Sequence, residues 1–304
     1  MDNYQHIIAM KLELNEKDYT DIKSLEAVCY EEQETNLKLE LDFKQKKSSI
    51  KNKIMSEFLY YENKILIGYL GLCNFGGPTV EVSGMVNPKY RRKGIFKKLY
   101  LLAKEEWQKV CIPEVLVLCD HKSISGLDFI NSIGAEYGSS EYKMCLNKKT
   151  LKVMPANAPE YARTKEYAIK LRVETSEDAV EIDRQNSIYS GALGEEAEED
   201  IEKAYMKLDD NFINYMAELK GEIVGKIHLS ITDNEGFIYG FGVLPDFRGK
   251  GYGREILISA LDILKKKQVG NIFLEVATEN KRALELYESC GFEEISVMDY
   301  YIVT

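Results

Sequence analysis

The chain repeats itself once at a fixed spacing, and this duplication constrains its fold more than any other feature. The segment VNPKYRRKGI at 86–95 resembles VLPDFRGKGY at 243–252, which lies 157 residues further along. The same offset relates two further pairs of glycines, Gly68 to Gly225 and Gly134 to Gly291. Because one register holds across turns and helices, we infer a tandem duplication of a single folding unit.

The duplication predicts two domains, which agrees with a chain of 304 residues at roughly 150 residues per domain. We place the first domain at 1–146 and the second at 167–304. The segment between them, 147–166, contains two prolines and no clear hydrophobic periodicity, so it is interpreted as a linker.

The sequence predicts the same order of secondary-structure elements in both copies. In the second copy, helical patterns at 176–189 and 195–208 precede three short strands joined by turn residues. A helix with one apolar stripe follows the glycine-rich segment, and a strand, a helix and a closing strand complete the copy. Short turns imply antiparallel pairing, so the expected fold is α/β, with a mostly antiparallel mixed sheet flanked by helices in each domain.

Composition excludes several classes of protein. A formal net charge of −10 argues against general nucleic-acid binding, and no apolar run reaches the length of a membrane span. The N-terminus lacks the layout of a signal peptide, and the six cysteines form no CxxC pair. These observations predict a cytoplasmic protein with reduced thiols. The three histidines are scattered, so we expect no metal site; oligomeric state is not indicated.

The segment LPDFRGKGYGREI at 244–256 interrupts a predicted strand-to-helix junction with three glycines. A helix N-terminus exposes unpaired N–H groups and a partial positive charge, and glycines let an anion approach the backbone closely. The residues suited to holding a pyrophosphate are Arg248, Gly249, Lys250, Gly251 and Gly253. The alternative is a glycine-rich turn with a solvated basic edge.

A dinucleotide site is the first anion-binding alternative. Its fingerprint requires GxGxxG, whereas this segment has GxGxG. Glu275 does end the next strand, where a ribose-binding acid would lie. However, the preceding strands form a meander with short turns rather than parallel crossovers, and no P-loop pattern is present, so this reading is disfavoured.

Two segments carry a family resemblance. VLPDFRGKGYG resembles the acetyl-CoA-binding signature of the GNAT-type N-acetyltransferases, [Q/R]-x-x-G-x-[G/A], with Arg248, Gly251 and Gly253 at its fixed places. NKRALELYESCGF resembles the second hallmark of the family. The residues that match it are Asn280, Ala283, Leu286, Tyr287, Gly291 and Phe292.

The resemblance implies an enzyme that transfers an acetyl group directly from acetyl-CoA, its cosubstrate, to a primary amine. The strand backbone at Phe241, Gly242 and Val243 would pair with the pantetheine arm. The backbone amides of five residues would hold the pyrophosphate: Gly249, Lys250, Gly251, Tyr252 and Gly253. Asn280 would help to place the pantetheine arm, and Tyr287 would protonate the departing sulfur. A nearby hydroxyl donor lowers the cost of expelling the CoA thiolate, because a free thiol has a pKa of about 8.5.

The general base and the acceptor are less defined. Glu275, acting through water, is the first candidate base, and His228 and Asp299 are weaker ones. The acceptor is expected to be a small-molecule or peptide amine. Five acids among residues 195–200 suggest a cationic acceptor, but acids in a first helical turn also simply favour the helix dipole.

The first copy departs from the family pattern at three positions. Phe96, Ser123 and Ile130 stand where the second copy has Gly253, Asn280 and Tyr287. An isoleucine cannot donate a proton, so we expect the first domain to be degenerate and the second to be catalytic, as in known tandem members such as mycothiol synthase. A second enzyme with a different proton donor is the other reading. For the whole chain, the alternative is a non-catalytic acyl-CoA-binding or regulatory protein.

Overall fold

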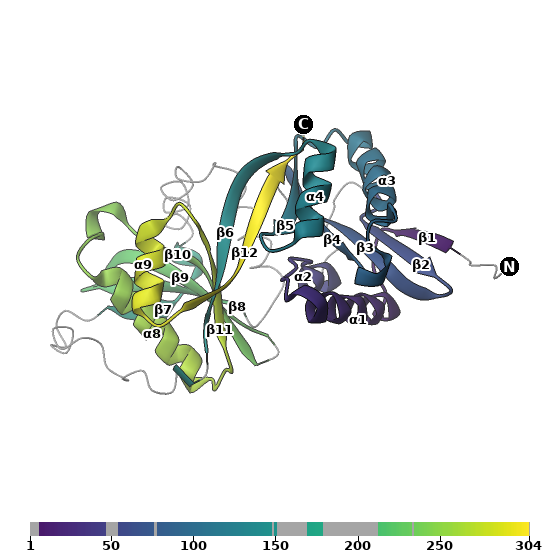
Figure 1. Cartoon of the computed structure of the whole chain (residues 1–304). Coiled ribbons are helices and arrows are strands. Elements are labelled where there is room, and N and C mark those ends of the chain that lie inside the picture. Colours follow the sequence, from purple (N-terminus) through teal and green to yellow (C-terminus); the bar gives the residue numbers. More distant parts are fainter. Residues whose placement is uncertain are drawn as a thin grey trace. The chain divides into compact units, whose positions relative to one another are not determined.

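The computed structural model describes residues 6–46, 54–75, 78–147, 149–150, 169–178, 212–232 and 234–303. The chain divides into two compact units (Figure 1). Unit 1 comprises Met1–Ser140 and Ser296–Thr304, and unit 2 comprises Glu141–Ile295. The helices predicted at 176–189 and 195–208, with the acidic stretch 195–200, lie almost wholly outside the described residues.

The sheet of unit 1 has the order β1-β2-β3-β4-β5-β12. Among the described strands of this sheet, β4 and β5 form the parallel pair, and the other neighbouring pairs are antiparallel. The elements of unit 1 are β1 (His6–Lys11), α1 (Glu16–Gln33), α2 (Leu41–Lys46), β2 (Glu57–Glu62), β3 (Ile65–Cys73), β4 (Thr79–Val86), η1 (Pro88–Tyr90), α3 (Ile95–Lys109), β5 (Glu114–Asp120), α4 (Ile124–Ile133) and part of β12 (Glu293–Ile302).

Helices cover both faces of this sheet: α1 and α2 one face, α3 and α4 the other (Figure 1). Strand residues alternate between the two cores, as a pleated strand requires. Leu59, for example, packs with the α1 side, whereas its neighbours Phe58 and Tyr60 pack with the α3 side. The α1 side also contains a buried cluster in which Lys44 Nζ lies 3.1 Å from Glu57 Oε1 and 3.1 Å from the Tyr69 hydroxyl.

The sheet of unit 2 has the order β6-β11-β10-β9-β8-β7. Here β10 and β11 are the parallel pair, and the other described pairs are antiparallel. The elements of unit 2 are part of β6 (Glu136–Leu146), β7 (Lys170–Val173), η3 (Ser176–Asp178), β8 (Phe212–Leu219), β9 (Glu222–Thr232), β10 (Glu235–Val243), η4 (Pro245–Phe247), α8 (Tyr252–Lys266), β11 (Ile272–Ala277) and α9 (Lys281–Ser289). The predicted fold class is confirmed.

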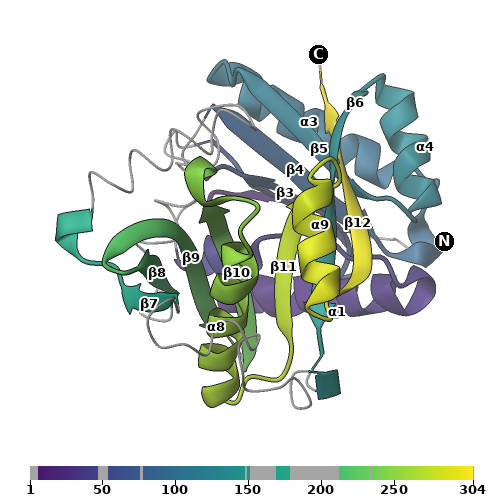
Figure 2. The ribbon, with the colours of Figure 1, turned by 90° about the vertical axis from the view of Figure 1, so that its left-hand side faces the viewer.

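Helices α8 and α9 lie on the same face of the unit 2 sheet (Figure 2). The apolar stripe predicted for α8 is buried in full, and it packs on alternate residues of β9, β10 and β11. The buried residues of that stripe are Ile256, Leu257, Ala260, Leu261 and Leu264. Burial of this stripe is the main source of stability for a helix of this length.

The duplication is visible in the element boundaries. Helix α3 begins at Ile95 and ends at Lys109, and α8 begins and ends 157 residues later, at Tyr252 and Lys266. The short η1 and η4 turns keep the same offset. The two copies therefore share one backbone plan through the segment that carries the predicted site.

The last strand of each copy joins the sheet of the other copy's unit. Residues 298–302 of β12 pair with β5 in unit 1, and residues 141–146 of β6 pair with β11 in unit 2. The boundaries predicted from the sequence, 1–146 and 167–304, remain a prediction and differ from the two units in this respect. Repeat similarity assigns a strand by its position in the duplicated copy, whereas ladder hydrogen bonds assign it to the sheet that it completes.

Side chains also fix β12 in unit 1. The buried Asp299 carboxylate accepts a hydrogen bond from Ser140 Oγ at 2.5 Å and lies 2.8 Å from His121 Nδ1. The His121 amide donates to Val297 O at 3.0 Å. A buried carboxylate requires such partners, so this cluster ties the C-terminal strand to the end of β5.

Candidate acyl-CoA site

The glycine-rich segment forms the connection between β10 and α8, as predicted. After the η4 turn, Gly249 and Gly251 adopt positive φ values of 73° and 86°, and Gly251 is the N-cap of α8. These left-handed conformations favour glycine at both positions. At Gly253 φ is not positive, and an added Cβ would meet only ordinary contacts, the nearest at 3.4 Å from Leu286 Cδ2.

This conformation leaves a run of backbone amides unpaired. Within the described part of the chain, no acceptor takes a hydrogen bond from the amides of Gly249 to Gly253. The first helical amides with a partner are those of Arg254 and Glu255, which both donate to Gly251 O. Five successive free N–H groups at a helix N-terminus have the donor geometry that phosphate oxygens require.

The two basic side chains of the loop bind the loop itself. Arg248 Nε donates to Val243 O at 2.8 Å, and Lys250 Nζ donates to Asp246 O at 2.8 Å. The guanidinium therefore fixes the end of β10 relative to the loop, a role that the sequence did not reveal. Both cations remain next to the free amides, where they add positive potential.

The strands beside the loop separate. Parallel pairing of β10 with β11 ends at Ile238 and Leu274, although both strands continue to Val243 and Ala277. The register between β10 and β9 shifts between Tyr239 and Gly242, which is a β-bulge. Beyond Ile238, the edge of β10 that faces β11 is thus without ladder bonds among the described residues, as pairing with an extended ligand would require.

The bulge also determines where Phe241 points. Gly240 within it has φ of 48°, and Phe241 packs with the α8 and α9 core, its ring centroid 6.3 Å from that of Tyr287. Strand β4 has no such shift, and its equivalent residue is Gly84. A Cβ at Gly84 would lie 2.2 Å from Tyr69 O, so the flat ladder excludes the side chain that the bulged strand admits.

Tyr287 lies on α9 within the unit 2 core and is 7% exposed. Burial raises the pKa of its hydroxyl well above the ordinary value of 10.0, so the group keeps its proton at neutral pH. No described residue makes a hydrogen bond to that hydroxyl. The side chain is therefore a protonated donor whose hydrogen bond is not used within the described fold.

The three candidate bases have different environments. Glu275 lies on the exposed face of β11, opposite Lys143 of β6 in the ladder and away from the core that contains Tyr287. His228 is buried in β9, and burial together with Lys226 lowers its pKa well below the ordinary value. Asp299 belongs to unit 1, where Ser140 and His121 bind it.

Asn280 is the N-cap of α9. Its side-chain oxygen accepts a hydrogen bond from the Ala283 amide at 3.2 Å, which satisfies one of the free donors of the helix start. Ser123 caps α4 in the same way, with Oγ accepting from the Gly126 amide at 3.2 Å. The exchange of asparagine for serine between the copies therefore conserves the cap, whatever else the asparagine amide contacts.

The loop of unit 1 keeps the backbone of its counterpart. Gly94 has φ of 76°, and Arg91 Nε donates to Val86 O at 3.1 Å, just as Arg248 donates to Val243 O. Arg92 stands at the position of Gly249 and has φ of 65°, an uncommon conformation for a residue with a side chain. The first copy thus retains the loop geometry at some conformational cost.

Above that loop, however, unit 1 is packed differently. The Phe96 ring, at the position of Gly253, makes an edge contact with Phe129 at 4.8 Å, and Phe129 also contacts Tyr100. The Arg92 side chain forms an ion pair with Asp128 of α4 at 2.8 Å. Aromatic rings thus join α3 to α4 where unit 2 has a glycine.

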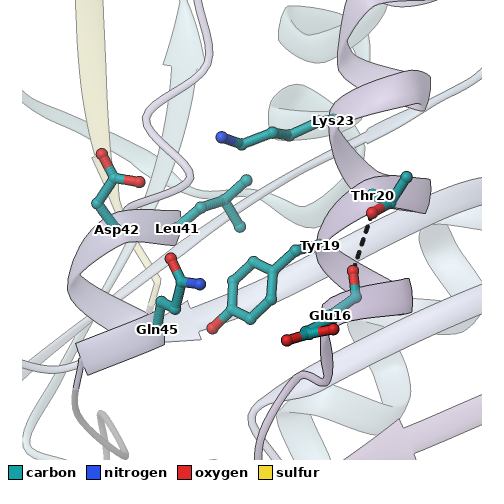
Figure 3. Close-up of a pocket in the computed structure, with 7 residues that line it drawn as sticks. All are labelled: Glu16, Tyr19, Thr20, Lys23, Leu41, Asp42 and Gln45. Carbon is teal, nitrogen blue, oxygen red and sulfur yellow. Dashed lines mark hydrogen bonds between the residues drawn. The ribbon is translucent and has the colours of Figure 1, made fainter. Parts of the chain in front are cut away.

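Unit 1 also has a surface pocket of about 340 Å³ between the first turns of α1 and helix α2 (Figure 3). Two carboxylates and one ammonium group contribute to its wall, and none of the site residues predicted from the sequence does. Burial and nearby carboxylates, Glu57 first among them, raise the pKa of Tyr19 in this pocket to about 12. The lining residues are Glu16, Tyr19, Thr20, Lys23, Leu41, Asp42 and Gln45.

Comparison with known proteins finds a family match in the second half of the chain. Residues 180–292, which include the glycine loop, β11 and α9, match the sequence profile of the acetyltransferase (GNAT) family. This segment of the chain is therefore similar to the GNAT family. The predicted resemblance is thereby confirmed.

Solved GNAT structures share the fold over nearly the whole chain. A GCN5-related N-acetyltransferase from Sphaerobacter thermophilus superposes with a TM-score of 0.75 at 18% identity, covering 98% of this chain and 95% of that one. A tandem GNAT protein from the clavulanic acid biosynthesis pathway gives a TM-score of 0.73 at 14% identity, covering 98% of both chains. At these identities the likeness concerns the fold, and it agrees with the duplicated architecture.

Curated GNAT relatives match over shorter segments. The [ribosomal protein bS18]-alanine N-acetyltransferase of Escherichia coli strain K12 is 30% identical over 95 residues, which is 31% of this chain and 64% of the relative. The mycothiol acetyltransferase of Beutenbergia cavernae is 38% identical over 82 residues, 27% of this chain and 28% of the relative. The chain thus spans less than two thirds of either relative.

No helix in the described part of the chain is both long enough and apolar enough to cross a bilayer, and no group of three or more His, Cys, Asp or Glu side chains in that part is arranged to hold a metal ion.

Proposed function

We propose that unit 2 catalyses transfer of an acetyl group from acetyl-CoA to a primary amine. The observation that carries this proposal is the run of amides from Gly249 to Gly253 that no described residue pairs with, beside a strand edge that no described strand occupies. The names of the curated relatives, both acetyltransferases, support the same reaction class.

The free amides would bind the pyrophosphate of the coenzyme. A diphosphate offers several acceptor oxygens and a negative charge, and the α8 N-terminus offers N–H groups and a positive partial charge. The unpaired edge at Phe241, Gly242 and Val243 would take the amides of the pantetheine arm as a further strand takes its neighbour. The thioester would then lie where β10 and β11 separate.

In the chemical step, the amine nitrogen attacks the thioester carbonyl. A carbon–nitrogen bond forms, the carbon–sulfur bond breaks, and the electron pair of that bond leaves on sulfur. Tyr287 gives its hydroxyl proton to the sulfur, and the amine loses one proton to a base. Burial keeps Tyr287 protonated, so the donor is present throughout the physiological pH range.

Glu275 is our candidate for that base, acting through a water molecule. It follows Leu274 at the point where the two strands separate, and it projects from the face opposite the Tyr287 core. Base and acid would therefore act from the two sides of the sheet. Asn280, as the cap of α9, would hold the helix that carries Tyr287 and place the pantetheine arm.

We assign no acetyl transfer to unit 1. Ile130 stands in place of the proton donor, β4 lacks the bulge, and aromatic rings fill the position of Gly253. Its loop nevertheless keeps the backbone geometry of an anion site, so its inactivity would follow from the missing acid and from the Phe96 ring rather than from a collapsed loop.

The test is thiol release from acetyl-CoA by the full chain with a panel of primary amines, followed by mass spectrometry of the products. Amine-dependent release with an acetylated product supports the proposal. Tight binding of CoA without turnover of any amine would instead favour a non-catalytic acyl-CoA-binding protein. Tight NADH binding without affinity for CoA would contradict both.

A further inference from the structure

One face of the unit 2 sheet carries a polar row, defined here as Glu174, Asn214, His228 and Tyr239. In the ladders, His228 pairs with Asn214 on one side and with Tyr239 on the other. The Glu174 amide donates to Asn214 O at 2.9 Å, which continues the row past the end of β7. Directly opposed residues in antiparallel strands point to the same face, so the four side chains are neighbours.

This face is the one opposite the α8 and α9 core. Ile227 and Leu229, which flank His228, belong to that core, as does Ile238 beside Tyr239. Tyr239, at one end of the polar row, therefore lies where β10 and β11 separate, on the face of the sheet opposite Tyr287. An acceptor approaching the thioester from this side would lie along the row.

Two acceptor atoms of the polar row lack partners. Glu174 Oε2 and Asn214 Oδ1 are inaccessible to solvent, and no donor among the described residues reaches either atom. A carboxylate oxygen and an amide oxygen accept hydrogen bonds and cannot donate them. Buried acceptors of this kind are normally satisfied, so these two are suited to a ligand that brings N–H donors.

The surrounding charges favour a cation. Arg172 on β7, two residues before Glu174, is already bound by Asp178 at 2.7 Å and by Glu218 at 2.6 Å. His228 is neutral at pH 7, because burial and Lys226 lower its pKa well below the ordinary value. Lys170, Arg172 and Lys226 lie near the row in the ladders, yet no ion pair within the described part of the chain engages the Glu174 carboxylate.

We infer that the acceptor is an extended diamine whose second ammonium group is held by Glu174 and Asn214. This inference rests on the proposed function. Adjacent strands lie about 4.8 Å apart, so β8 and the end of β7 lie about 10 to 14 Å from β10, where the reacting nitrogen would be. The acceptor would therefore carry its two nitrogens about 10 to 14 Å apart.

The experiment compares monoamines with diamines on the full chain at saturating acetyl-CoA. The probes are n-octylamine, 1,4-diaminobutane, 1,8-diaminooctane and 1,10-diaminodecane. We expect the two long diamines to exceed octylamine by about 10- to 100-fold in kcat/KM, the range for a hydrogen bond to a charged group, and the short diamine to gain little. The gain should appear in KM, because the second nitrogen takes no part in the chemical step.

Variants then assign the gain to the polar row. Glu174→Gln should reduce the preference for 1,8-diaminooctane over octylamine about tenfold or more, with CoA affinity unchanged. Asn214→Asp should increase that preference, because it adds a charge in the same shape, and it keeps the test available should Glu174→Gln fail to fold. Glu177→Gln, which removes an exposed carboxylate from the neighbouring η3 turn, is the matched control.

The possible outcomes separate the two proposals. Acetylation of octylamine and the diamines with equal kcat/KM would overturn the acceptor assignment and leave the acetyltransferase proposal intact. A diamine preference that Glu174→Gln and Asn214→Asp both leave unchanged would overturn it as well. If no amine in the series is acetylated although CoA binds, the proposed function fails, and this inference fails with it.

Discussion

Replacing Tyr287 with phenylalanine removes the proposed proton donor and keeps the aromatic ring of the side chain. The hydroxyl has no hydrogen-bond partner among the described residues, so its removal breaks no hydrogen bond within that part of the fold. We therefore expect the free energy of unfolding to change by less than about 1 kcal/mol, since no buried partner is left unsatisfied. Turnover should fall about 10²- to 10⁴-fold, which is the usual contribution of a positioned acid.

The assay is amine-dependent thiol release by the full chain, with CoA affinity measured by calorimetry and stability by urea unfolding. Tyr215→Phe, a change on β8 at the edge of the same core, is the matched control and should leave turnover unaltered. An unchanged rate for Tyr287→Phe would remove this residue from the mechanism. A loss of CoA binding or of stability would show that the ring hydroxyl acts structurally.

The pKa of Tyr287 adds a pH prediction. Because burial raises it above 10.0, the folded protein retains this proton through the whole physiological range. The stability that the neutral phenol contributes is complete below the unfolded value of 10.0, and it is lost only as pH rises through the higher folded value. Any fall in kcat between pH 7 and pH 9 must therefore come from another group.

Three further predictions follow from the packing. Gly253→Ala should retain CoA binding in calorimetry, because the new Cβ would lie 3.4 Å from Leu286, an ordinary contact. Gly253→Phe, which copies Phe96 of the first repeat, should abolish CoA binding. Equal CoA affinity of the two variants would contradict the proposed coenzyme site. Lys44→Met should lower the free energy of unfolding by about 3–5 kcal/mol, because it leaves Glu57 as an uncompensated buried charge. Desolvation already raises the pKa of Glu57, so protonation favours the folded state and the deficit should shrink as pH falls in urea titrations; a constant deficit would refute this account. Deleting residues 296–304 should remove β12, the antiparallel partner of β5. The amides of Leu116 to Asp120 that β12 protects should then exchange rapidly with deuterium. Retained protection of these amides would contradict the strand exchange.

Much of the local structure could be predicted because it depends on residues that are close together in the sequence. The spacing of apolar residues predicted α8, and the offset of 157 residues reproduced the limits of α3 in α8. Left-handed glycines at 249 and 251 follow from the same short motif. These features depend on short-range sterics and periodicity, which a sequence displays directly.

The exchanged strands could not be predicted, because the sequences of β6 and β12 specify an antiparallel edge but not which sheet receives it. Either strand would satisfy β5 or β11 with similar ladder bonds, and tertiary packing decides between them. The polar row was missed for a related reason. Glu174 and Asn214 are 40 positions apart, and only the register of β7, β8 and β9 makes them neighbours.

Part of the site was nonetheless within reach of the sequence. Gly240 and Gly242 could have indicated an irregular strand in β10, where the observed register shift occurs, although no bulge was predicted there. The anchoring role of Arg248 was not visible, since a basic residue beside glycines suggests contact with an anion rather than with Val243 O. Asn280 likewise matched a family motif without revealing that it caps α9.

The central claim is that the amides of Gly249 to Gly253 hold the pyrophosphate of an acyl carrier, and amide chemical shifts test it most directly. CoA should be titrated into the isotope-labelled full chain, because each unit of the fold contains the last strand of the other copy. The account predicts saturable shifts of these five amides, each following one binding curve. Saturable binding that leaves these amides unmoved, while those of Arg92 to Phe96 in unit 1 shift instead, would contradict it.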